Sequence, residues 1–131
     1  MFKESIVCTV IIVLILIGNT ITQNYVISSI NELSKELSEL RENIESDKEN
    51  IKKDDIKNKF SNIEKKWKDR FKKLAYFIEH DELEKVEKNL VLLNSYIKTN
   101  SYEEAIAELN QSYFSLNHLE DKYNFDLENI F

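Results

Sequence analysis

Proline is absent from this chain of 131 residues, Gly18 is its single glycine, and Cys8 is its single cysteine. Glycine and proline form most tight turns of hairpins and sheets, so their scarcity argues against a β-rich fold. One cysteine excludes a disulfide framework within the chain and a zinc site built from cysteines. Leu, Lys, Glu, Ile and Asn are abundant instead. We therefore predict an all-α fold.

Recognisable catalytic motifs are also lacking. The sequence has no HExxH motif, no glycine-rich phosphate loop and no nucleophile elbow, so we expect neither enzymatic activity nor a cofactor. One polar cluster, His80, Asp81 and Glu82, offers nitrogen and oxygen atoms that could bind a metal ion. The favoured interpretation is structural: His80 lies at the C-terminus of the second helix and Asp81 caps the third.

A strongly apolar stretch, residues 6–17, lies near the N-terminus. Ten of its twelve residues are Ile, Leu or Val, and no charged side chain occurs between Glu4 and Glu32. Each such apolar residue favours the bilayer by about 0.3 to 0.6 kcal/mol at the centre of a span. Because a span needs roughly 20 residues, the helix is expected to extend through residues 18–22. We predict a cytoplasmic start and a transmembrane anchor over residues 1–22.

A cleaved signal peptide is the alternative interpretation, because a short basic start before an apolar run is also typical of secretory signals. Cleavage requires small residues at the third and first positions before the cut. The best pairs are Gly18 with Thr20 and Thr20 with Thr22, and no alanine is available there. The sequence therefore favours an uncleaved anchor.

The distribution of basic residues predicts the orientation. The free amine and Lys3 lie before the apolar run, whereas Lys35 and Arg41 follow it only after a long uncharged segment. Basic residues near a span favour the cytoplasmic side. We expect a single-pass protein of the cell membrane, with its N-terminus in the cytoplasm and residues 23–131 outside as one helical bundle domain.

Apolar residues then recur with helical spacing. Between residues 26 and 44 they alternate four and three positions apart, which is a heptad seam of nearly three repeats. Nothing obliges the helix to stop before Asp47, so the span is predicted to continue into the domain as one rod of about 40 residues. The seam consists of Val26, Ile30, Leu33, Leu37, Leu40 and Ile44.

Beyond the apolar run, we predict four helices that form an antiparallel bundle. They cover about residues 23–47, 54–79, 82–98 and 102–121. Trp67 and Phe71 are expected at the centre of the core, on the apolar stripe of the second helix. Asp81 with Glu84, and Ser101 with Glu104, have the spacing of capping boxes at the starts of the third and fourth helices. Asn100 suits a tight turn because it tolerates left-handed backbone, and residues 123–131 are expected to dock on the bundle.

Charge is unevenly distributed along a chain whose formal net charge is −6. Residues 23–51 hold 3 basic and 7 acidic side chains, residues 52–73 hold 10 and 4, and residues 79–131 hold 4 and 12. Neighbouring antiparallel helices could complement each other through weak ion pairs. Alternatively, a lysine-rich face could bind an anionic ligand such as lipid headgroups or wall polymers. That candidate interaction surface consists of Lys59, Lys65, Lys66, Lys68, Lys72 and Lys73.

Several segments together resemble an uncharacterised family. They are the basic start with its apolar span, the helix that contains Trp67, residues 77–86 (FIEHDELEKV), residues 96–98 (YIK) and residues 127–131 (LENIF). Over nearly its full length the chain resembles the family catalogued as domain of unknown function 4363. The resemblance implies a single-span, helical bacterial protein without catalytic residues. It also implies an operon that encodes a multi-pass membrane protein, and hence an accessory subunit.

Two functional hypotheses follow. The favoured one is a membrane-anchored helical interaction module that binds a membrane protein partner and performs no chemistry. The alternative is an extracytoplasmic binder or sensor of an anionic ligand. Nucleic acid is not expected as a partner of a net-acidic domain outside the cytoplasm. A monomer, in which the second helix folds back along the seam, is favoured over a homodimer in which two seams pair as a coiled coil.

Overall fold

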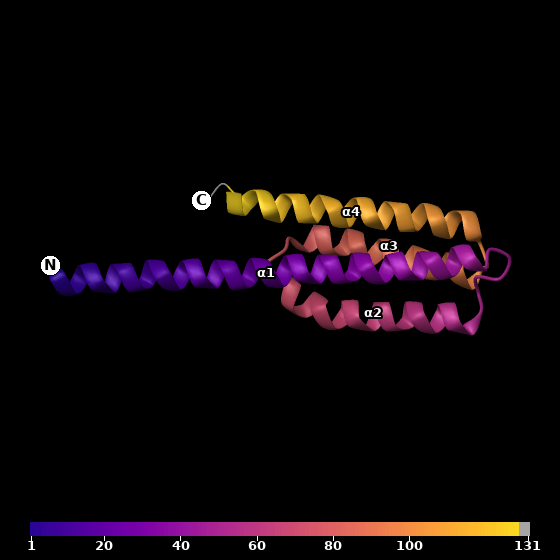
Figure 1. The fold of residues 1–131 in the computed structure, drawn as a ribbon, viewed down its shortest axis with the longest axis horizontal. Coiled ribbons are helices and arrows are strands. Elements are labelled where there is room, and N and C mark those ends of the chain that lie inside the picture. Colours follow the sequence, from indigo (N-terminus) through magenta and orange to yellow (C-terminus); the bar gives the residue numbers. More distant parts are fainter. Residues whose placement is uncertain (129–131) are drawn as a thin grey trace.

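A computed structural model describes residues 1–128 of the chain as four helices joined by short turns. The helices are α1 (Phe2–Ser46), α2 (Asp54–Leu74), α3 (His80–Lys98) and α4 (Tyr102–Glu128). Each helix runs antiparallel to the one before it, so the chain goes up and down along one axis (Figure 1). The predicted all-α fold, with a long apolar N-terminal helix that continues into a bundle, is confirmed.

α1 is one continuous helix of 45 residues, about 67 Å long at 1.5 Å per residue. Its N-terminal half projects beyond the other helices, and every residue from 1 to 21 is exposed (Figure 1). This half is long and apolar enough to cross a membrane. Val26 is the first buried residue along α1, so the bundle begins directly where the apolar segment ends.

The C-terminal half of α1 supplies the heptad seam to the core. All six seam residues are buried, and Leu37, Leu40 and Ile44 are buried completely. α1 packs against α2 on one side and α4 on the other, and α3 closes the ring between α2 and α4. Among the described residues, the backbones of the diagonal pairs, α1 with α3 and α2 with α4, do not approach each other closely. The fold is therefore a four-helix bundle with the seam covered from within the same chain.

The aromatic centre of the second helix differs partly from the prediction. Trp67 is 3% exposed and lies in the core, as predicted. Phe71 is only partly buried and packs on the rim of the core. Its ring packs edge-on against the rings of Trp67 and His80, with centroid distances of 6.2 and 6.0 Å. Leu74, at the last position of α2, is fully buried.

α2 ends at Leu74 rather than near residue 79. The next residues form a tight turn, in which the amides of Phe77 and Ile78 both donate to the Leu74 carbonyl at 2.9 and 2.8 Å. This turn buries Ile78 under the bundle. A straight continuation of α2 would have carried Ile78 past the end of the core.

The start of α3 also corrects the prediction. α3 begins at His80, its N-cap is Glu79, and no side chain caps it. His80 is therefore the first residue of α3 rather than the last of α2, and Asp81 lies inside the first turn instead of capping it. The expected capping box fails because the turn after Leu74 already directs the chain into the helix two residues earlier.

α4 begins at Tyr102 and continues to Glu128, beyond the predicted end at residue 121. The extension keeps the core spacing, because Leu116, Leu119 and the partly buried Tyr123 follow one another on the same face. Gln23 Nε2 donates to the Tyr123 carbonyl at 3.0 Å, which joins this end of α4 to α1. The predicted docking of residues 129–131 lies outside the described residues.

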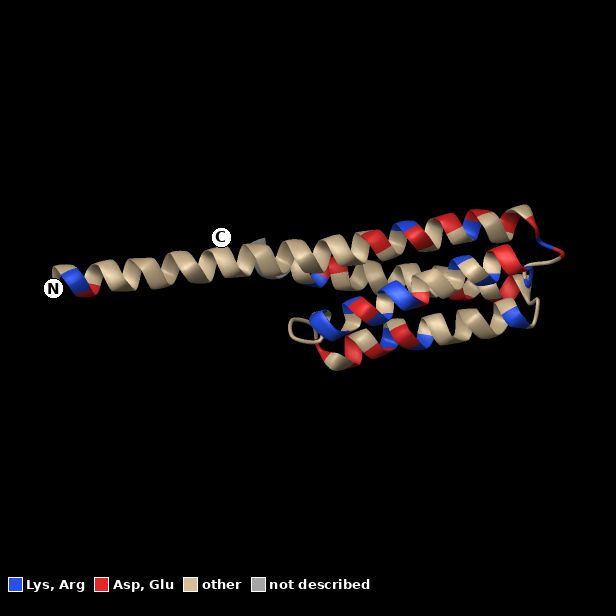
Figure 2. Cartoon of the chain, turned by 90° about the horizontal axis from the view of Figure 1, so that it is seen from below, with Lys and Arg blue, Asp and Glu red and all other residues tan. Residues whose placement is uncertain are grey.

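Charged side chains of both signs alternate over the bundle, whereas the projecting half of α1 shows none between its first turn and the bundle (Figure 2). The lysine-rich α2 lies beside the acidic part of α1. Cross-helix ion pairs join Lys59 to Glu39, Lys66 to Glu36, and Arg70 to Glu32. The charge complementarity predicted between these neighbouring segments is thus present.

Candidate functional site

The six lysines of the candidate interaction surface do not form one free face. Lys59 and Lys66 point toward α1 and pair with its carboxylates, and Lys68 Nζ pairs with Glu64 of its own helix at 3.0 Å. Lys65, Lys72 and Lys73 are exposed and form no ion pair within the described part of the chain. The structure therefore divides the set into a structural group and a remaining group of three.

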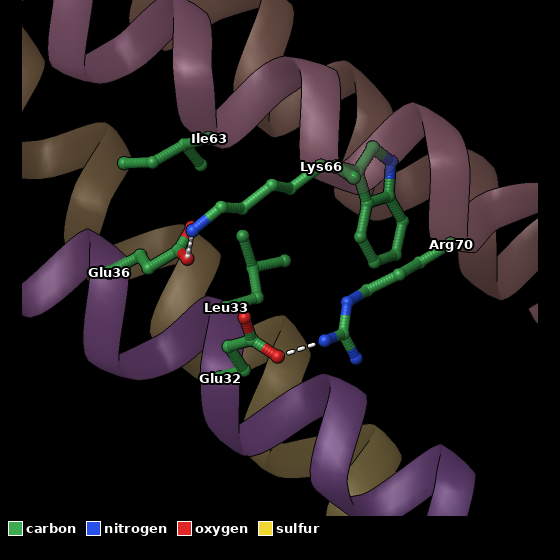
Figure 3. Close-up of a pocket in the computed structure, with 7 residues that line it drawn as sticks. Glu32, Leu33, Glu36, Ile63, Lys66 and Arg70 are labelled. Carbon is green, nitrogen blue, oxygen red and sulfur yellow. Dashed lines mark hydrogen bonds and ion pairs between the residues drawn. The ribbon is translucent and has the colours of Figure 1, made fainter.

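Two lysines of the structural group, Lys59 and Lys66, belong to a polar ladder along the junction of α1 and α2. Lys66 Nζ lies 2.6 Å from Glu36 Oε1, and this hydrogen bond raises the pKa of Lys66 above its usual value (Figure 3). Arg70 pairs with Glu32 and also donates from Nη1 to the Ser29 hydroxyl at 2.7 Å. These contacts hold α2 in register with α1.

The space beneath this ladder is too small for a ligand. Leu33, Ile63 and Trp67 pack under the ion pairs and leave a cavity of about 10 Å³, close to the size of one water molecule (Figure 3). Trp67 Nε1 is buried without a hydrogen-bond partner among the described residues. The junction of α1 and α2 is therefore a packed interface, and its charges serve the fold.

The polar cluster at the start of α3 is spread over separate contacts. His80 Nε2 lies 3.0 Å from Glu84 Oε1, and Glu82 pairs with Lys85 at 3.5 Å. Asp81 is exposed to solvent. The structure does not bring these three side chains together around one point, and among the described residues no group of three or more His, Cys, Asp or Glu side chains is arranged to hold a metal ion.

Two exposed apolar features were missed by sequence reasoning. On α3, Val91 and Leu92 line an open groove of about 530 Å³ together with Glu84, Glu87 and Lys88. The signal in the sequence was the run of four residues from Leu90 to Leu93, three of them leucine, which is wider than a single helical stripe. Leu90 and Leu93 enter the core, so Val91 and Leu92 remain outside.

The second missed feature is the turn between α2 and α3. Tyr76 is 84% exposed and Phe77 is 43% exposed, and their rings lie 6.4 Å apart. The sequence contained a signal here too, because these aromatics fall between the apolar stripes of two helices. The turn is positioned by the burial of Ile78 and by the pair between Glu79 and Lys122 of α4, 3.4 Å apart.

Residues 20–130 match the family described as Domain of unknown function (DUF4363). The chain belongs to this family. The matched part of this DUF4363 protein begins at the end of the projecting segment and covers nearly the whole bundle. No curated protein and no solved structure matches the chain.

Proposed function

We propose that this DUF4363 protein is a membrane-anchored helical interaction module, an accessory subunit that binds an integral membrane protein and performs no catalysis. One observation carries the proposal. A single helix, α1, is apolar and exposed along its first half and buried in the bundle along its second half. Exposed apolar surface of that extent is stable only when a membrane or a partner covers it.

The arrangement of the bundle supports binding rather than chemistry. Its best-defined charged cluster is used in joining α1 to α2, and the cavity beneath that cluster is no larger than about one water molecule. Its accessible apolar features, the α3 groove and the turn after α2, lie on the surface. The anionic-ligand alternative is supported less well, because three of the six lysines are engaged in ion pairs.

The proposed membrane topology places the N-terminus in the cytoplasm and residues 23–131 outside the cell. A variant with Cys8→Ser and Glu49→Cys places one thiol on an exposed residue of the turn between α1 and α2. A membrane-impermeant maleimide should label it in intact cells, and the intact mass should show that residues 1–22 are retained. Labelling only after lysis would reverse the orientation, and a mass lacking these residues would show that the segment is a cleaved signal.

Partner binding is tested by capturing the full chain from cross-linked native membranes. The control is Trp67→Ala, which keeps the anchor but removes the centre of the bundle core. We expect an integral membrane protein to co-elute in fixed proportion with the wild type and to be lost with the control. Equal recovery with both chains would assign the interaction to the anchor alone, and recovery with neither would reject the accessory-subunit role.

A further inference from the structure

The turn between α2 and α3, residues 75–79, lies at the end of the bundle from which the apolar half of α1 projects (Figure 1). Its level along α1 follows from contacts between the helices. Arg70 meets Ser29 of α1, and Lys73 Nζ lies 6.0 Å from the Tyr25 ring. Because α2 runs antiparallel to α1, residues 75–77 lie beside the turn of α1 just before Tyr25.

This level corresponds to the surface of a bilayer that α1 spans. A hydrocarbon core of about 30 Å is crossed by about 20 residues, so a span that begins at Ser5, after the last charge, ends near Asn24. The turn then lies within about one helical turn, roughly 5 Å, of the hydrocarbon boundary. A tilt of about 20° across the distance of about 10 Å between packed helices changes its depth by only roughly 3 to 4 Å. The turn therefore stays near the headgroup layer.

The side chains at this level suit a lipid surface. Tyr76 and Phe77 are exposed side by side, and aromatic residues are enriched where membrane meets water. Lys72 and Lys73, in the last turn of α2, form no ion pair among the described residues. Basic residues beside a membrane are attracted to anionic headgroups.

Within the segment 75–85, three of the four acidic side chains are paired with basic neighbours or histidine. Glu79 pairs with Lys122, Glu82 with Lys85, and Glu84 with His80. Asp81 is the one acidic residue of the segment 75–85 without an ion pair in the described structure. Asp69 of α2 and Asp121 of α4 are also exposed and form no ion pair with the rest of the described chain, so the free charge at this end is mixed. Among the described residues, Lys72 and Lys73 are the free cations next to the turn, and they are the groups that can meet an anionic surface.

We propose that the turn between α2 and α3 is a second membrane contact, in which Tyr76 and Phe77 enter the headgroup layer and Lys72 and Lys73 bind anionic headgroups. The contact rests on the proposed role of α1 as a membrane span. It docks the bundle onto the bilayer and fixes its orientation. The occupant of this surface is the lipid itself.

The experiment uses the full chain in vesicles of phosphatidylcholine and phosphatidylglycerol. An environment-sensitive fluorophore is attached either to native Cys8, or, with Cys8→Ser, to Ala75→Cys in the turn or to Glu49→Cys at the opposite end of the bundle. Quenching is measured with nitroxides placed on the lipid headgroup or on the acyl chain. We expect headgroup quenching and a blue shift at position 75, acyl-chain quenching at position 8, and neither at position 49.

A matched pair of variants tests the aromatic residues. Tyr76→Ser with Phe77→Ser should abolish most of the quenching at position 75, whereas Val91→Ser with Leu92→Ser, which changes an exposed apolar pair on α3, should leave it unchanged. Replacing phosphatidylglycerol with phosphatidylcholine should weaken the quenching through the loss of lysine attraction.

The outcomes separate the two proposals. Quenching at position 8, with position 75 no more quenched than position 49, would overturn the second contact and leave the span intact. Because the vesicles contain no other protein, that result would mean that the turn requires a protein occupant. Absence of acyl-chain quenching at position 8 would overturn the span and the contact together.

Discussion

Asn100 joins the two turns at the end of the bundle farthest from the apolar segment. Its backbone has φ 56, the one positive φ among the described residues. Its side chain accepts a hydrogen bond from the Ile51 amide at 2.8 Å and donates to the Glu49 carbonyl at 2.9 Å. One residue thus shapes the turn between α3 and α4 and also anchors the turn between α1 and α2.

Replacing Asn100 separates these two roles. Asn100→Gly keeps the left-handed backbone and loses both hydrogen bonds, so we expect a loss of about 1 to 2 kcal/mol in unfolding free energy. Asn100→Ala should lose about 1 kcal/mol more, because a Cβ disfavours left-handed backbone. Denaturant unfolding in detergent micelles, followed by circular dichroism, measures both. Equal stability of the two variants would show that the backbone conformation relaxes at little cost.

Trp67 is the largest side chain in the described core, and its truncation should be severe. Trp67→Ala is expected to lower the unfolding free energy by about 3 to 5 kcal/mol, a large part of the 5 to 15 kcal/mol that is typical for a small domain. Trp67→Phe should cost clearly less, because Nε1 has no hydrogen bond to lose. Thermal melting of the full chain gives the comparison, and an unchanged melting temperature in Trp67→Ala would place the indole outside the core.

At the junction of α1 and α2, the contacts of Arg70 should stabilise the fold more than those of Lys66. Arg70 contacts both Glu32 and Ser29 and its side chain is 27% exposed, whereas Lys66 pairs with Glu36 alone within the described chain and its side chain is 58% exposed. A double-mutant cycle of Glu32→Gln and Arg70→Gln should give a coupling of about 0.5 to 1 kcal/mol.

The matched cycle of Glu36→Gln and Lys66→Gln should give about 0.2 to 0.5 kcal/mol and should weaken further with added salt. A larger coupling at Lys66 would reverse the ranking and show that exposure does not limit that pair.

The faces of the helices were predictable because burial repeats with the helical period. The alternation from Val26 to Ile44 gave the seam, and the opposed charges of neighbouring segments indicated that α2 lies beside α1. Helix ends were less predictable because no glycine or proline marks them. Ile78 fits the stripe of α2 and is buried as that stripe predicts, yet α2 ends at Leu74 and a tight turn carries Ile78 into the core.

The candidate site was predictable only in part, for a related reason. The spacing of a lysine from the apolar residues predicts which face of the helix it occupies. Whether that lysine forms an ion pair depends on whether a carboxylate of the neighbouring helix lies within reach. Lys66 meets Glu36 and is engaged, whereas Lys72 meets none. The exposure of Tyr76 similarly depends on the course of a turn that local sequence does not specify.

At the scale of the whole molecule, the covered seam predicts a monomer. The full chain in detergent should have the mass of one protein by light scattering after correction for the micelle. Leu37→Asp places an unpaired charge at a site that is 0% exposed, and it should cost about 4 kcal/mol or more and give a molten monomer. A stable dimer that Leu37→Asp converts into a folded monomer would instead show that two chains pair through the seam.

The unbroken course of α1 fixes a rotational phase between the apolar segment and the bundle. At about 100° per residue, the direction of the seam continues into the segment through Asn19, Ile15, Ile12 and Cys8, while Val10 and Ile17 face the opposite way. Inserting one residue near Gly18 would turn the bundle by about 100° relative to the segment, and seven residues would nearly restore the alignment. The side of α1 on which a neighbouring membrane helix packs therefore decides its position relative to the bundle. A neighbour on the side of Cys8 would lie directly beneath the bundle. A neighbour on the side of Val10 and Ile17 would lie on the opposite side of α1 from the bundle.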